Sequence, residues 1–139
     1  MPVETHRINV ATKGNNQILD LTAEVSRAID HGHILDGTVT VFVVGSTGGI
    51  TTTEFEPGLV QRDLRVAFEK IAPEDGTYLH EQTWHDDNGH SHVRASLLGP
   101  SLTIPLVEGR LTLGTWQQII LIDFDTRPRN REIIVQVIG

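Results

Sequence analysis

The chain has 139 residues, of which 38% are hydrophobic and 21% charged, and its formal net charge is −7. This composition predicts a folded domain rather than a disordered chain. An acidic surface repels phosphate backbones and no basic run is present, so we expect no nucleic-acid partner. The absence of cysteine excludes disulfides and thiolate chemistry. No leader pattern opens the sequence and no apolar run approaches the ~18 residues of a membrane span, so a cytoplasmic protein without membrane contact is expected.

The first third of the chain predicts two strands around a helix. Residues 5–12 alternate polar and apolar side chains, which is typical of a strand. Residues 16–32 carry apolar side chains at helical spacing, with Asn16 as the expected N-cap and Gly32 as the stop. Residues 37–45 are β-branched and bounded by glycines, which indicates a buried strand.

The rest of the chain adds one predicted helix and several strands. A short strand at residues 50–53 precedes a helical pattern over residues 57–73, which begins and ends at prolines. The tail is strand-like at residues 95–99, 102–107, 115–125 and 132–139, with a tight turn at residues 108–110. We therefore expect a single α+β domain over residues 1–139, with two helices packed on a largely antiparallel or mixed sheet system.

The segment "HDDNGHSH" contains a His-x-His pair next to two aspartates. On a strand, residues i and i+2 point to the same face, so His90 and His92 could converge on one metal ion. His80 would be the third ligand if the chain turns back at residues 86–89, whose side chains favour turns. Three neutral imidazoles suit Zn²⁺ or another late divalent metal. The alternative is a solvated hairpin end that binds nothing, and His85 is expected to be exposed in either case.

The segment "GSTGGITTTE" combines glycines with hydroxyl side chains. Successive backbone N–H groups around Ser46, Thr47 and Gly48 could cradle an anion such as phosphate. The alternative is a flexible turn between two buried elements. Glu54 follows directly and is a candidate general base or extra metal ligand. It could equally be a carboxylate favoured near the start of the next helix.

Further candidates for substrate binding lie in the tail and in the histidine segment. Trp116 could stack on a heteroaromatic ligand and Gln117 could read its edge, although on an alternating strand the two face opposite sides unless the strand bulges. Arg131 and Arg110 are candidate phosphate forks, although lone arginines are more often surface residues. Asn88 is placed with the substrate-binding group.

Four segments together resemble the YjbQ-like family: "GSTGGITTTEFEPGLVQRDL", "YLHEQTW", "NGHSHVRASLLGPSLTIPLVEGRLTLGTWQQIILIDFD" and "REIIVQVIG". The piece "GRLTLGTWQ" is the most diagnostic. The resemblance implies an α+β fold, a homotrimer, a polar pocket near the subunit boundary, and the family's label of secondary thiamine-phosphate synthase. Many members carry a His-Thr-Thr-Ala run where this chain has Ser46-Thr47-Gly48-Gly49, so the imidazole expected there is missing.

Two functions are consistent with these residues. The first is a metal-assisted enzyme acting on a phosphorylated small molecule, either a thiamine-phosphate synthase-like transferase or a metal-dependent hydrolase. In it His80, His90 and His92 would hold the metal and Glu54 would move protons. A three-histidine site suits hydrolysis better than pyrophosphate release, because Mg²⁺ prefers oxygen ligands. The second is a non-enzymatic trimeric module that binds a small ligand or a metal.

Overall fold

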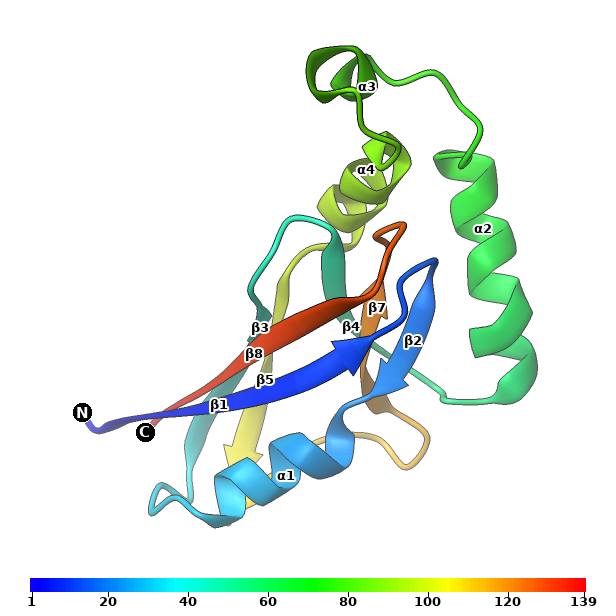
Figure 1. Cartoon of the computed structure of the whole chain (residues 1–139). Helices are drawn as coiled ribbons and strands as arrows, with labels where there is room; N and C mark the ends of the chain where they lie inside the picture. The colour runs from blue at the N-terminus through cyan, green and yellow to red at the C-terminus, as the bar shows by residue number, and fades with distance from the viewer.

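The computed structural model describes residues 1–139 and shows an α+β protein built on two antiparallel sheets (Figure 1). The larger sheet has the strand order β1-β8-β3-β5-β6, with bounds Val3–Thr12, Arg129–Ile138, Gly37–Val43, Ser101–Val107 and Arg110–Leu111. The smaller sheet has the order β2-β7-β4, with bounds Gln17–Asp20, Gln118–Asp123 and Gly48–Thr53. The predicted α+β class is confirmed.

The main core lies between the two sheets. Alternate residues of β3, β5 and β8 point inward and meet alternate residues of β7, such as Ile119 and Leu121, and all of these are fully or nearly fully buried. Helix α1 (Thr22–Asp30) contributes Val25 and Ile29 to this core. Figure 1 places α1 at one end of the pair of sheets and α3 and α4 at the opposite end. The sheets therefore enclose an apolar interior. Polar groups are needed only at the end where this interior reaches solvent.

Strand β7 is apolar on both faces because it serves two cores. Ile120 and Ile122 point away from the main core and pack, with Phe124, under the helices. They meet side chains of α2 (Leu64–Ile71) and α4 (Gly89–Leu98). Strand β7 leaves no exposed edge, since it is the central strand of its sheet and is paired with β2 and β4.

Most of the predicted elements are present, but two segments differ. Residues 17–20 form β2, and α1 begins only at Thr22, where the Asp20 carboxylate accepts hydrogen bonds from the Thr22 N–H and hydroxyl. Asn16 is therefore not an N-cap. A π-helical turn (Leu59–Asp63) leads into α2 as the second predicted helix.

Two further helices replace the hairpin expected around the histidines. Helix α3 (Leu79–Trp84) ends before the turn predicted at residues 86–89, and helix α4 replaces the strand that was expected to carry His90 and His92. Gly89 begins α4 in close contact with α3, because a Cβ there would lie 2.4 Å from the Tyr78 Cβ. The position requires glycine for this close approach.

Candidate active site

The inner face of β7 changes from apolar to acidic at its end. Continuing the two-residue period past Leu121 places Asp123 and Asp125 on the core side of the strand. Arg131, on the inner face of β8, meets Asp123 in a two-pronged ion pair, with Nε–Oδ2 at 2.8 Å and Nη2–Oδ1 at 2.9 Å. The Arg131 and Asp123 side chains are only 6% and 1% exposed. The pair closes the main core at the end opposite α1.

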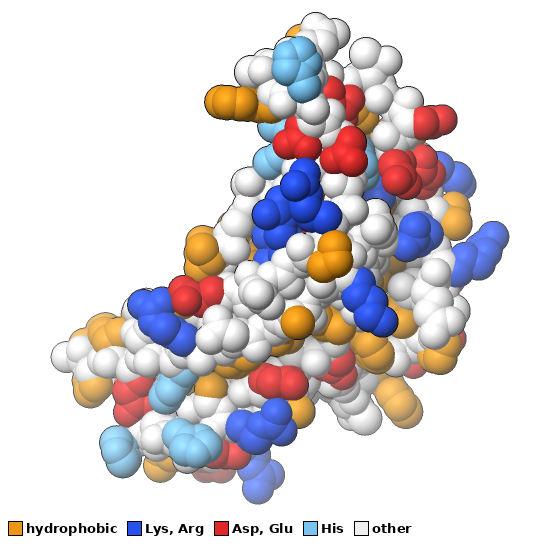
Figure 2. Space-filling model, viewed as in Figure 1, with side chains coloured by type: hydrophobic (Ala, Val, Ile, Leu, Met, Phe, Trp, Pro, Cys, Tyr) orange, Lys and Arg blue, Asp and Glu red, His pale blue; other side chains and the backbone are white.

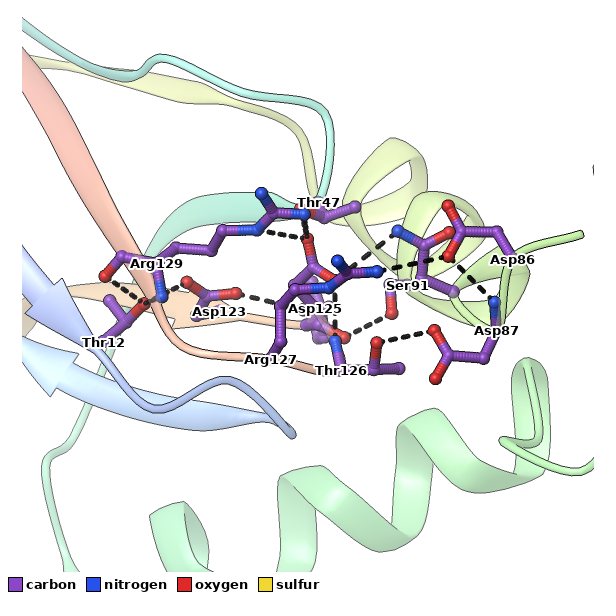
Figure 3. A network of polar contacts seen from close by, with 12 residues as sticks. Thr12, Thr47, Asp86, Asp87, Ser91, Asp123, Asp125, Thr126, Arg127 and Arg129 are labelled. Carbon is purple, nitrogen blue, oxygen red and sulfur yellow. Dashed lines mark hydrogen bonds and ion pairs between the residues drawn. The ribbon is translucent and has the colours of Figure 1, made fainter. Parts of the chain in front are cut away.

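Two threonines add hydrogen bonds to this ion pair and to Asp125. Thr12 donates its hydroxyl hydrogen to Asp123, and Thr47 donates to Asp125 Oδ2 at 2.9 Å while accepting from Arg131 Nη2 at 2.7 Å. Figure 3 shows the two aspartates between these hydroxyls. Burial acts to raise the pKa of Asp123, but hydrogen bonds from Arg131 and Thr12 outweigh it and leave the pKa lowered. Asp123 is therefore ionised at neutral pH.

Asp125 connects the Asp123–Arg131 ion pair to the histidines. It pairs with Arg129, whose Nε lies 3.0 Å from Oδ2, and it accepts from the Thr126 N–H at 2.7 Å. Asn88, at the start of α4, directs its amide nitrogen at Asp125 Oδ1 over 3.5 Å. The amide oxygen of Asn88 faces His80 Nε2 at 3.1 Å. A chain of polar contacts thus runs from the end of β7 to α3.

His80 and His92 lie side by side, with ring centroids 4.5 Å apart. One imidazole comes from α3 and the other from α4, so the helix pair brings them together. The pKa of His92 is lowered, first by burial and then by the neighbouring His80, so its ring is neutral at pH 7. A neutral imidazole beside a second one can accept a proton from a bound ligand.

His92 and the residues around Asp125 face a polar cavity of about 370 Å³ with no hydrophobic lining residue, whereas His80 is linked to this cavity through His92 and Asn88. Figure 2 shows acidic, basic and histidine side chains gathered at this end of the molecule, over α3, α4 and the turn after β7. The lining residues come from the loop after β3, from α4 and its start, and from the β7–β8 turn: Gly45, Ser46, Thr47, Asn88, His92, Asp125, Arg129, Asn130 and Arg131.

The predicted three-histidine metal site does not form. His90 and His92 lie on helix α4 rather than on a strand, and residues two apart on a helix do not share a face. His90 points to the other side of α4, where it is buried near Tyr78 and its Nδ1 has no hydrogen-bond partner. No three histidine or carboxylate side chains come close enough to hold a metal ion among themselves. His85 is exposed, as expected.

The two aspartates of "HDDNGHSH" hold the segment to the β7–β8 turn. Asp87 accepts from the Thr126 hydroxyl at 2.8 Å, and Asp86 lies 3.5 Å from an Arg127 guanidinium nitrogen (Figure 3). Next to them, the Ser91 hydroxyl donates to the Phe124 carbonyl. These contacts dock the start of α4 on the end of β7, and they explain why carboxylates accompany the histidines.

The predicted phosphate loop lies at the cavity but differs in detail. Ser46 and Thr47 line the cavity, whereas Gly48 is a buried residue of β4 paired with Asp123. The Thr47 hydroxyl is already used by Asp125 and Arg131. Gly45 has φ +133°, and a Cβ there would meet Arg131 Nη1 at 2.6 Å, so this position also requires glycine.

Glu54 and the tail residues lie elsewhere. Glu54 and Trp116, both exposed, line a separate cleft at the opposite end of β4, about 17 Å of strand from Gly48 at ~3.3 Å per residue. Gln117 lines a third cleft and donates to the Thr52 hydroxyl at 3.0 Å. The structure therefore separates these three residues from the histidines, so Glu54 cannot move protons for them.

Sequence reasoning missed Asp123, Asp125 and Arg129. Arg131, which was a candidate phosphate fork, lines the cavity and is buried rather than at the surface. A signal was available for the two aspartates and for Arg131. The two-residue period of "IILIDFD" places both aspartates on the face of buried Leu121, and the period of "REIIVQV" does the same for Arg131 with respect to Ile133. Charges of opposite sign at the buried ends of two strands indicate a buried ion pair.

Comparison with known proteins gives the family. The profile of the UPF0047 protein YjbQ-like family matches residues 6–139. A UPF0047 protein of Methanothermobacter thermautotrophicus is 37% identical over 100% of this chain and 94% of its own length. The chain belongs to the UPF0047 (YjbQ-like) family.

Solved structures of similar proteins share the fold. The crystal structure of a hypothetical protein from Aeropyrum pernix K1 has a TM-score of 0.90 and 31% identity and covers 98% of both chains. That of an uncharacterised conserved protein of the yjbq/upf0047 family from Clostridium acetobutylicum has a TM-score of 0.81 and 37% identity, over 94% of this chain and 99% of that chain. The resemblance to the YjbQ-like family is thus confirmed. Separately, none of the helices has the length and apolar character needed to cross a membrane.

We predict that Asp123→Asn destabilises the fold by about 3 kcal/mol, because it leaves the buried Arg131 charge without its ionic partner. The value lies at the lower end for broken buried pairs since Asp125 remains 4.0 Å from Arg131 Nη2. Urea unfolding at pH 7 measures the loss. Glu132→Gln is the matched control: its 2.7 Å pair with Arg7 is solvent-exposed and worth about 0–1 kcal/mol. Equal losses in both variants would contradict a structural role for the buried pair.

Proposed function

We propose that the chain is a small enzyme that hydrolyses a phosphorylated small molecule in the cavity lined by His92, Arg129 and Arg131. The observation that carries the proposal is the state of the Arg131 guanidinium. Its Nε and Nη2 are held by Asp123 and Thr47, while Nη1 makes no hydrogen bond within the chain and lies beside Gly45 at the cavity wall. A guanidinium fixed on one side and open on the other is prepared to donate to an anion.

The open N–H donors around the cavity favour a ligand that carries negative charge. Arg129 is paired with Asp125 and Arg131 with Asp123, so these four side chains together are neutral. Their carboxylates are engaged by the arginines and by Thr12 and Thr47, while guanidinium N–H groups remain open. A phosphate group can accept several of these hydrogen bonds at once, whereas a neutral ligand would use few of them.

His80 and His92 supply the proton transfer. Hydrolysis needs a base that takes a proton from the attacking water, and a neutral imidazole within reach of the ligand can do this. Burial and the adjacent His80 lower the pKa of His92, which keeps it unprotonated at neutral pH. The two rings lie next to one another, so a proton taken by one can be shared with the other. Glu54 has no part in this scheme.

Hydrolysis suits the cavity better than the thiamine-phosphate coupling that the family label suggests. Coupling joins two heteroaromatic rings, which need apolar or aromatic surfaces for stacking. The cavity has no hydrophobic lining residue, and Trp116 lies in the distant cleft. The second candidate is a non-enzymatic module that binds the same anion, supported by the same guanidinium groups without any use of the histidines.

As an alternative to proton transfer by the histidines, we propose a divalent metal, Zn²⁺ in the first instance, bound by two histidines instead of the three first expected. His80 and His92 would be its two protein ligands and His90 would take no part. Imidazoles are suitable ligands for Zn²⁺, and a bound ion would act as a Lewis acid toward phosphate oxygens. The adjacency of the two rings supports this arrangement.

Self-association as a homotrimer is proposed from the outer face of the larger sheet together with the family resemblance. On this face Phe42 lies next to Ile134, and Thr40 donates to or accepts from Thr103 at 3.2 Å, while the charges of Arg7 and Glu132 pair with each other. Phe42 is 40% exposed and Val44 46%. Low charge and exposed aromatic side chains are typical of interface cores. The number three comes from the resemblance alone.

We predict that inorganic phosphate binds in the cavity and that Arg129→Gln weakens it about tenfold, the equivalent of ~1.4 kcal/mol. Chemical-shift titration of the ¹⁵N-labelled protein measures both affinities. Arg127→Gln is the control, because it removes the same charge from the same turn but does not line the cavity. Phosphate release from a panel of phosphomonoesters then tests turnover, where His92→Gln should lower kcat by about 100-fold or more.

The outcomes of these assays separate the candidate functions. Phosphate binding without turnover of any ester would favour the binding module. Product formation from a pyrimidine diphosphate and a thiazole phosphate, with no ester hydrolysis, would favour the synthase. Equal weakening by Arg127→Gln and Arg129→Gln would show that phosphate responds to overall charge rather than to the cavity.

For the metal we predict that His92→Ala abolishes most Zn²⁺ uptake, because one protein ligand of two remains. His90→Gln should leave uptake unchanged, since His90 faces the other side of α4. Titration calorimetry at neutral pH measures both. His85→Asn is a second control, and asparagine tolerates the positive φ of that position. No uptake by the unaltered protein, or equal loss in His90→Gln, would contradict the two-histidine site.

For the assembly we predict a particle of three times the 15.4 kDa chain mass in light scattering at micromolar concentration. Phe42→Glu should shift it toward monomer, because the carboxylate would be buried without a partner in the interface. Phe55→Glu is the matched control, an aromatic of similar exposure in the cleft near Trp116. A clean monomer for the unaltered chain would end the trimer proposal.

A further inference from the structure

The contacts of Asn88 fix which way its amide points. Asn88 is 4% exposed, so its side chain has little access to solvent. Its Nδ2 lies 3.5 Å from Asp125 Oδ1 and its Oδ1 lies 3.1 Å from His80 Nε2. An ionised carboxylate only accepts hydrogen bonds, so the amide nitrogen must face Asp125. Turning the amide over would place two oxygens against each other in a buried site.

Asp125 is ionised in the folded protein, which makes this orientation obligatory. Burial acts to raise the pKa of Asp125, but the Thr47 hydroxyl, the Thr126 N–H and Arg129 act against burial and leave the pKa lowered. The hydroxyl of Thr47 and the guanidinium of Arg129 both donate to Oδ2. Oδ1 remains for Thr126 and for Asn88.

The amide oxygen of Asn88 then decides which ring nitrogen of neutral His80 carries the hydrogen. An amide oxygen accepts and cannot donate, so the ring nitrogen that faces it must carry a hydrogen. In a neutral imidazole only one nitrogen carries a hydrogen, and the other keeps its lone pair. His80 Nδ1 makes no hydrogen bond within the chain, so its lone pair is free.

We propose that Asp125 and Asn88 fix the tautomer of His80, with the hydrogen on Nε2 and the lone pair on Nδ1, so that Nδ1 is the one ring nitrogen of His80 that can accept a proton. Asn88 and Asp125 are positioning residues in this scheme. The role as base rests on the proposed function, but the tautomer does not. The same arrangement orients metal-binding histidines, which usually donate their second ring N–H to an oxygen of the protein.

The test reads the tautomer directly, without ligand. Two-bond ¹H–¹⁵N correlation spectra of the histidine-labelled protein, recorded about 1.5 pH units above the ordinary histidine pKa of ~6.5, distinguish the two ring nitrogens. His80→Gln assigns the His80 signals. We expect widely separated Nδ1 and Nε2 shifts for His80, with the hydrogen on Nε2.

Variants show whether Asn88 is the cause. In Asn88→Ala the two His80 shifts should move toward each other, as both tautomers become populated. Asn130→Ala is the matched control: Asn130 lines the same cavity but has no contact with His80, so the His80 shifts should not change. Asp125→Asn should also mix or reverse the tautomers, because an amide at position 125 can donate to Asn88 and allow it to turn over.

Two results would overturn the inference. One is a hydrogen on Nδ1 of His80 in the unaltered protein. The other is an unchanged His80 tautomer in Asn88→Ala, a variant that tests the inference even if Asp125→Asn fails to fold. The Nε2–H tautomer with no ester turnover would instead leave the inference intact and reject the proposed hydrolysis, so the two failures are distinguishable.

Discussion

The buried ion pair between Asp123 and Arg131 is the constraint on which the rest of the structure depends. Removing both charges from water is costly, and the cost is offset by the two-pronged geometry and by hydrogen bonds with Thr12, Thr47 and the Asp125 N–H. The pair joins the ends of β7 and β8 where the main core opens. It therefore sets the direction in which the chain leaves β7, and with it the position of Asp125. The cavity and both imidazoles are arranged around that second carboxylate.

Most strands and the first two helices could be predicted because their apolar side chains follow simple periods. Helix α4 could not, because the buried part of its surface is polar. The residues that it buries are Gly89, His90, Ser91, Arg94 and Ala95, so no apolar stripe marks the helix in the sequence. The apolar residues near its end, such as Leu97, are exposed or only partly buried and suggested a strand. Tertiary hydrogen bonds rather than periodicity define this element.

The candidate site could be predicted only in part from the sequence, for a related reason. The histidines and aspartates of "HDDNGHSH" indicated a functional site. A two-residue period could have placed Asp123 and Asp125 on the core side of β7. The pairing of His80 with His92 could not be read in the same way, since it depends on how α3 packs against α4. The spacing of His90 and His92 led to a wrong prediction, because residues two apart share a face on a strand but lie on different faces of a helix.

The polar buried face of α4 follows from where the helix must sit. Arg94 donates to the Ala72 carbonyl and pairs with Glu69 at 2.7 Å, which ties α4 to the end of α2 and beyond it. Ser91 ties the same helix to the Phe124 carbonyl at the end of β7. Apolar contacts would hold α4 against its neighbours but would allow it to slide or rotate, whereas these hydrogen bonds have fixed partners and directions. Rotation of α4 would move His92 and Asn88 away from Asp125, so the directional anchors preserve the geometry on which the site depends.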